Sequence, residues 1–152
     1  MRALALLVLL PILCATCSAV ETVTATPAVV DPACAQADTF VPGIEHLGDG
    51  GLFRVRIDSA SPSVPALGLN TWNLAVTAEG EAAPSVVLVA EPTMPTYRHG
   101  TIPKTQRVVT DPAGRAVFDQ LNLFKPGLWK ITMYATGVSG HSDVLQFRFC
   151  IP

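Results

Sequence analysis

The chain has 152 residues, a formal net charge of −2 and four cysteines, and 49% of its residues are hydrophobic. This length suits one domain with a core of its own. A weakly acidic chain without a cluster of lysines and arginines argues against nucleic acid, and against an anionic membrane surface, as a partner.

Residues 1–19 have the pattern of a secretory signal peptide. Arg2 supplies a positive charge, residues 3–13 form an uncharged apolar run, and Cys17-Ser18-Ala19 places small residues before a cleavage point. The run is too short to span a bilayer, which needs about 20 apolar residues. We therefore expect an exported protein of the periplasm or cell envelope, without a transmembrane segment in the mature chain.

Lipid attachment at Cys17 is the alternative to cleavage after Ala19. A lipid-acceptor cysteine normally follows Leu at position −3 and a small residue at −1, whereas Cys17 follows Cys14 and Thr16. The fit to a lipoprotein signal is therefore poor.

Cys34 and Cys150 remain once a signal peptide is removed. They form an even pair in a chain bound for an oxidising compartment, and no C-x-x-C spacing points to a redox or metal pair. We expect them to form a structural disulfide between the N-terminal segment and the last strand.

Residues 20–50 are expected to be an extended N-terminal arm that precedes a domain over residues 51–152. Residues 20–32 are rich in Thr, Ala, Val and Pro and show no helical period, and residues 42–51 are rich in turn formers. His46 lies in this arm, beside Glu45, and we expect its side chain to be solvated.

From residue 52 onward, apolar and polar residues alternate as they do in half-buried β-strands. Seven segments show the pattern: 52–58, 72–77, 86–90, 106–110, 116–120, 129–135 and 145–149. Their number and spacing predict an immunoglobulin-like antiparallel β-sandwich of about seven strands. A closed barrel is less favoured, because the strands are few and the loops uneven. Trp72 and Trp129 alternate in phase with apolar neighbours and are expected in the core.

Three motifs stand at the strand starts and on the two longer loops, residues 91–104 and 122–128. They are Gly68-Leu69-Asn70-Thr71-Trp72, Met94-Pro95-Thr96-Tyr97-Arg98-His99-Gly100-Thr101 and Leu123-Phe124-Lys125-Pro126-Gly127-Leu128-Trp129. Together they resemble the YtkA-like domain family, which is related to FixH-type domains. The resemblance covers residues 50–150, and Asp143 corresponds to an Asp that the family carries before its last strand.

The resemblance implies an exported or membrane-tethered domain associated with copper handling and oxidase assembly. It also implies that the two loops meet at one end of the sandwich. Thioether and imidazole groups are suitable ligands for Cu(I). Met94 and His99 supply one of each at the corresponding positions of the motif. Tyr97 stands where the family has its first His, and Lys125 where it has its second Met.

The sequence leaves the role of Met94 and His99 open. In one interpretation they bind Cu(I), with Met133 or His141 completing the site. In the other, Met94 packs against the end of the sandwich and His99 forms a hydrogen bond in a turn.

No residue pattern indicates an enzyme. His141, Ser142 and Asp143 are contiguous, but adjacent side chains diverge on a strand, and no G-x-S-x-G elbow is present. Two functions remain open. One is a copper-handling accessory protein of the cell envelope with a degenerate site, and the other is a metal-free interaction or scaffold module that docks a protein partner.

Overall fold

The computed structural model describes residues 31–152, so the expected signal peptide, the lipid-attachment alternative and the first part of the expected arm lie outside the described residues. The elements are η1 (Pro32–Gln36), β1 (Ile44–Leu47), β2 (Arg54–Ser61), β3 (Gly68–Ala78), β4 (Glu81–Ala82), β5 (Val87–Met94), β6 (His99–Gly100), β7 (Gln106–Val109), β8 (Arg115–Leu123), β9 (Gly127–Thr136) and β10 (Ser142–Ile151). Within this part of the chain, no helix has the length and apolar character needed to cross a membrane.

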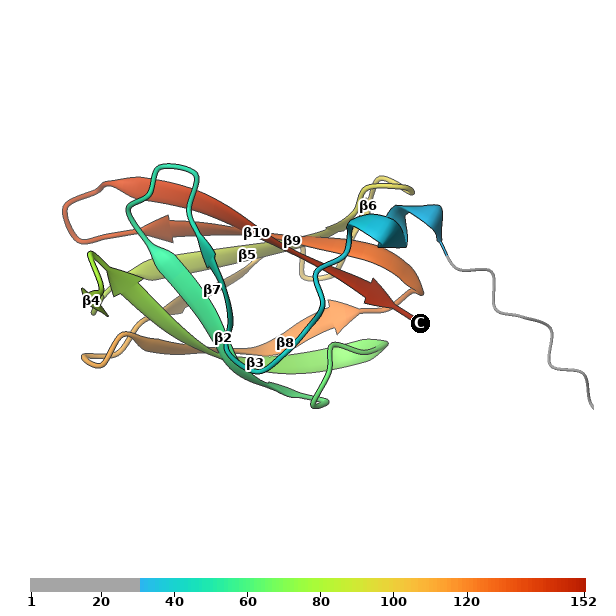
Figure 1. Ribbon diagram of the computed structural model, residues 1–152, viewed down its shortest axis with the longest axis horizontal. Coiled ribbons are helices and arrows are strands. Elements are labelled where there is room, and N and C mark those ends of the chain that lie inside the picture. Colours follow the sequence, from blue (N-terminus) through green and yellow to red (C-terminus); the bar gives the residue numbers. More distant parts are fainter. Residues whose placement is uncertain (1–30) are drawn as a thin grey trace, which may run out of the picture.

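The strands form two antiparallel sheets packed as a sandwich (Figure 1). The first sheet has the order β1-β2-β3, and the second edge of β3 pairs with β8 and, at its end, with β4. The second sheet has the order β10-β9-β5, and the second edge of β5 pairs with β7 and then β6. The predicted all-β sandwich is confirmed, and each of the seven predicted segments is a strand.

Alternation places one face of each strand in the core between the sheets. Trp72 of the first sheet and Trp129 of the second are both fully buried, as expected. The Trp72 ring also meets Phe149 of the opposite sheet edge to face, with ring centroids 5.5 Å apart. Aromatic side chains therefore join the two layers directly.

Residues 38–47 of the expected arm contact both sheets. Strand β1 pairs with β2 in the first sheet. On the second sheet, the backbone N of Asp38 donates to the Arg148 carbonyl at 2.6 Å, and the Asp38 carboxylate accepts from the Arg148 backbone N at 2.7 Å. This segment thus covers part of the edge of β10, which would otherwise present unpaired backbone groups.

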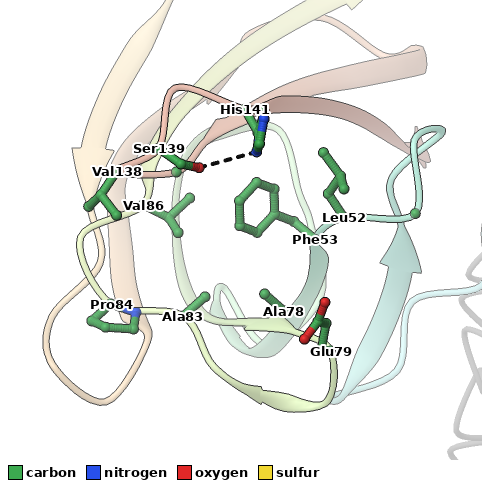
Figure 2. A pocket seen from close by; sticks show the side chains of 12 residues that line it. Leu52, Phe53, Ala78, Glu79, Ala83, Pro84, Val86, Val138, Ser139 and His141 are labelled. Atoms are coloured by element: carbon green, nitrogen blue, oxygen red, sulfur yellow. Dashed lines mark hydrogen bonds between the residues drawn. The ribbon is translucent and has the colours of Figure 1, made fainter.

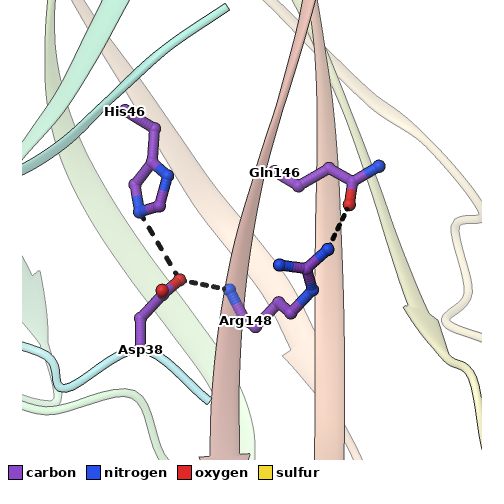
Figure 3. Close-up of polar contacts among 4 residues, drawn as sticks. All are labelled: Asp38, His46, Gln146 and Arg148. Carbon is purple, nitrogen blue, oxygen red and sulfur yellow. Dashed lines mark hydrogen bonds and ion pairs between the residues drawn. The ribbon is translucent and has the colours of Figure 1, made fainter. Parts of the chain in front are cut away.

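The expectation that His46 is solvated is met only in part, because its side chain is 34% exposed. Its ring packs against Phe147, with ring centroids 4.6 Å apart. Its Nε2 lies 3.5 Å from the Asp38 carboxylate (Figure 3), so one edge of the ring is covered. Strand β1 brings His46 over β10, a contact between residues about a hundred positions apart that local sequence does not indicate.

The predicted disulfide between Cys34 and Cys150 is present. It joins η1 to the last strand across a sequence separation of 116 residues. The two ends of the described chain are therefore fastened to each other next to the β9–β10 pair.

If the chain is cleaved after Ala19, as the sequence predicts, we expect no free thiol, because Cys34 and Cys150 are bonded to each other. Thiol labelling of the unfolded, unreduced protein should find none, and two labelled cysteines would contradict the assignment.

Replacing Cys34 and Cys150 together by Ser should lower the free energy of unfolding by up to about 4–5 kcal/mol, since the cross-link closes a long loop in the unfolded chain.

Candidate functional site

The two loops that carry the resemblance meet at one end of the sandwich, as expected. The Lys125 Nζ lies 3.9 Å from the centroid of the Tyr97 ring, which is a cation–π contact. We call residues 94–105 and 123–128 the loop end. The two positions at which this chain departs from the family motif are therefore in contact with each other.

The turn that carries Lys125 is held from below by Trp129. The Trp129 Nε1 donates to the Lys125 carbonyl at 2.8 Å, and the Phe124 ring packs on Trp129 edge to face, with centroids 5.5 Å apart. Gly127 has φ +122°, and a Cβ there would lie 3.0 Å from the Met94 Cε. The positive φ favours glycine at this position, and the close approach to the Met94 side chain adds to that preference.

Asp31 joins three segments at the loop end, which sequence reasoning did not find. Its carboxylate accepts hydrogen bonds from the Thr96 hydroxyl at 3.3 Å, the Leu128 backbone N at 3.4 Å and the Ala33 backbone N at 2.9 Å. Asp31 lies in a stretch rich in Ala, Val and Pro that has the composition of a tether. The composition gives no sign of these distant contacts.

Met94 is a core residue and has no exposed surface. The expected loop over residues 91–104 begins too early, because β5 continues through Pro92 and ends at Met94. On the edge of β5 that faces β7 and β6, β7 pairs with residues 87–90 and β6 with residues 93–94. Pro92 lies between these two paired stretches, so its missing N–H interrupts no pairing on that edge. The alternation of β5 therefore carries the Met94 thioether into the interior. His99 lies in β6, opposite Met94 in register, and the structure describes its backbone only.

Met133 and His141 do not complete a site with Met94. Met133 is fully buried and pairs with Ala90, four residues from Met94, or about 13 Å along β5 at roughly 3.3 Å per residue. His141 lies beside the start of β10, at the end of the sandwich where β5 begins. The β9–β10 hairpin turns at the opposite end from the loop end, so neither residue is placed to complete the site of the copper interpretation.

Two described features of the loop end are unfavourable for a copper ion. The Met94 thioether is buried, and the Lys125 ammonium covers the Tyr97 ring. A nearby ammonium also repels a cation. Among residues 31–152, no group of three or more His, Cys, Asp or Glu side chains is placed to hold a metal ion.

The surface of the loop end combines positive charge with exposed apolar side chains. Arg98, Lys104 and Lys125 are its cations, and Lys104 forms an ion pair with Glu91 at 3.3 Å. Tyr97 is 44% exposed and Phe124 48% exposed. Exposed aromatic rings and arginine are enriched at protein-binding surfaces, and Arg98 is exposed next to Tyr97.

Asp143 is buried at the opposite end, where it organises the loop before β2. Its carboxylate accepts hydrogen bonds from the backbone N–H groups of Gly50, Leu52, Phe53 and Val144 at 2.7–3.2 Å. A Cβ on Gly48 would lie 2.1 Å from this carboxylate, so only glycine fits there. Burial raises the pKa of Asp143, but the four N–H donors outweigh it and hold the pKa below its usual value.

The three contiguous residues His141, Ser142 and Asp143 have separate partners. The His141 Nδ1 lies 3.3 Å from the Ser139 hydroxyl, and the Ser142 hydroxyl lies 2.8 Å from that of Thr136. Asp143 faces the loop before β2. The arrangement is therefore not that of a nucleophile, base and orienting acid in series.

We predict that Asp143→Asn lowers the free energy of unfolding at pH 7 by about 2–3 kcal/mol, because hydrogen bonds to a buried charge are lost. A carboxylate whose pKa is lower in the folded than in the unfolded protein stabilises the fold when it is ionised. This contribution is complete above the pKa of the unfolded state, about 3.9, and is lost as pH falls through the pKa of the folded state. Denaturant unfolding across the acid range should therefore show the difference between native and variant shrinking below about pH 4. A difference that is independent of pH would contradict this role for the carboxylate.

The chain shows no match to any protein-family model, to any curated protein or to any solved structure in the comparisons made with each.

Proposed function

We propose that this chain is an exported accessory protein of the cell envelope that docks a protein partner through its loop end. It acts by binding, without catalysis and without a copper ion. The observation that carries the proposal is the contact between Lys125 and Tyr97, at the two positions where the YtkA-like motif has soft metal ligands.

The Lys125–Tyr97 pair favours a protein ligand over a metal ion. It places a cation and an aromatic ring together on the surface, with the Phe124 ring exposed on the same turn. Trp129 and Asp31 hold both loops from beneath, so a partner would meet an ordered surface. Since the cations of the loop end outnumber its acids, the partner surface would carry acidic side chains.

A photo-crosslinking experiment in the producing cells tests the docking surface. A photoreactive phenylalanine derivative at position 97, which keeps an aromatic ring beside Lys125, should give a discrete adduct with one envelope protein. Lys125→Glu in the same chain should weaken this adduct at least fivefold. The matched control is the same amino acid at Val117, which is also exposed but lies mid-strand on β8. Equal adducts at both positions, or none at position 97, would contradict the proposal.

Copper handling is the second candidate, and it rests on the motif resemblance and on the meeting of the two loops. We predict weak Cu(I) binding or none by the native, disulfide-bonded protein. Tyr97→His with Lys125→Met should strengthen binding at least tenfold, because it adds an imidazole and a thioether at positions in contact and removes a positive charge. An anaerobic titration against a competing chelator measures the change.

The control for this restoration is Tyr97→Phe with Lys125→Leu, which removes the same charge and adds no ligand. His99→Ala reports on the remaining imidazole of the motif. Tight Cu(I) binding by the native chain would overturn the metal-free proposal. Unchanged binding after the double restoration would show that the motif does not form a metal site in this fold.

A further inference from the structure

The end of the sandwich opposite the loop end carries a pocket of about 340 Å³ (Figure 2). It opens among the residues before β2, the end of β3, the residues before β5 and the β9–β10 hairpin. This volume is at the lower end of the range for small-molecule sites, which is about 300–1,000 Å³.

The lining of this pocket is apolar with one charged group. Its apolar side chains are Leu52, Phe53, Ala78, Ala83, Pro84, Val86 and Val138. Glu79 is the only Asp, Glu, Lys or Arg in the lining, and no ion pair joins it to another described residue. Ser139 and His141 add polar groups on the hairpin side, 3.3 Å apart.

We propose that the pocket binds a small organic amine. The hydrocarbon or aromatic body of the amine lies against the apolar lining, and its ammonium pairs with the Glu79 carboxylate. This site goes beyond the docking function proposed for the loop end and lies at the other end of the sandwich.

The pocket is formed before any ligand arrives, because hydrogen bonds hold its sides. The Asp143 carboxylate accepts from the backbone N–H groups of Leu52 and Phe53. The Thr110 hydroxyl donates to the Ala83 carbonyl at 2.7 Å and accepts from the Val86 backbone N at 2.8 Å. A preformed pocket loses little conformational entropy when it binds.

The β9–β10 hairpin closes over Phe53, which forms the floor of the pocket. The Gly137 backbone N donates to the His141 carbonyl at 2.9 Å and so closes the turn. A Cβ on Gly137 would lie 3.0 Å from the Phe53 Cζ, so the ring packs directly against this glycine. The ring is 8% exposed and supplies an aromatic surface to the pocket.

Glu79 occupies a backbone conformation that a glutamate rarely adopts. Its φ is +52°, and Gly80 follows with φ +89°, in the turn between β3 and β4. Asn, Asp or Gly is normally found at the first position of such a turn. The chain thus keeps a glutamate at a conformational cost, and no ion pair within the described fold offsets it.

The test uses 2-phenylethylamine as the probe, titrated into the ¹⁵N-labelled full chain near pH 7. We expect saturable shifts confined to amides of residues 51–53, 78–86 and 137–141, with a Kd of about 1 mM, as is common for a ligand of this size. The acid 3-phenylpropionate, which has a similar body and the opposite charge, should bind at least fivefold more weakly.

Two variants and a matched control locate the site. Glu79→Gln should weaken amine binding at least fivefold, and Ala78→Phe should abolish it by filling the pocket. Ala75→Phe, on the same strand but outside the lining, should leave it unchanged. The proposal is overturned if the shifts do not saturate or are scattered, if the acid binds as well as the amine, or if Glu79→Gln has no effect in a folded protein.

Discussion

The packing of the two sheets through their inner faces is the constraint on which the other features depend. Trp72 and Phe149 meet across the layers, and Trp129 lies buried in the second sheet. A shift of one residue in any strand would turn its apolar side chains to solvent. The core therefore fixes the register of the strands, and the register decides which side chains reach the two ends of the sandwich.

This constraint settles the position of Met94. The buried positions of β5 alternate through Leu88, Ala90, Pro92 and Met94. The position of the Met94 thioether therefore follows from the alternation of the strand, and the thioether belongs to the core. Position 125 lies in a turn outside that alternation, which leaves its side chain free to reach Tyr97 on the surface.

A few buried or half-buried polar groups then fasten the loops to this core. Asp143 holds the loop before β2, Asp31 holds the loop end, and Asp38 holds the N-terminal segment on β10. Each carboxylate accepts at least one backbone N–H group that strand pairing does not satisfy, from a residue about 90 or more positions away. Both ends of the sandwich thus have ordered surfaces built from loops.

Sequence reasoning found what depends on local pattern. Seven of the strands, the two tryptophans and the Cys34–Cys150 pair all follow from alternation or from residue counts. Strands β4 and β6 were not found, because two residues are too few for a pattern. Strand β1 was not found, because its four residues lie within a turn-rich stretch that was assigned to the arm.

The candidate site was predicted in part. The motif resemblance brought Met94, Tyr97 and Lys125 to one end of the sandwich. It did not show that Pro92 is accommodated within β5, and it could not find the carboxylate contacts of Asp31 and Asp143. Those contacts depend on the folded topology, since they join segments far apart in the sequence.

The account rests on the Met94 thioether being part of the core and not a metal ligand. Labelling the methionine ε-methyl groups with ¹³C tests this directly, with the buried Met133 as an internal reference. We expect a soluble paramagnetic agent to broaden the Met94 and Met133 signals equally little, and Cu(I) to move neither. A Met94 methyl that is broadened strongly, or that shifts when Cu(I) is added, would contradict the account.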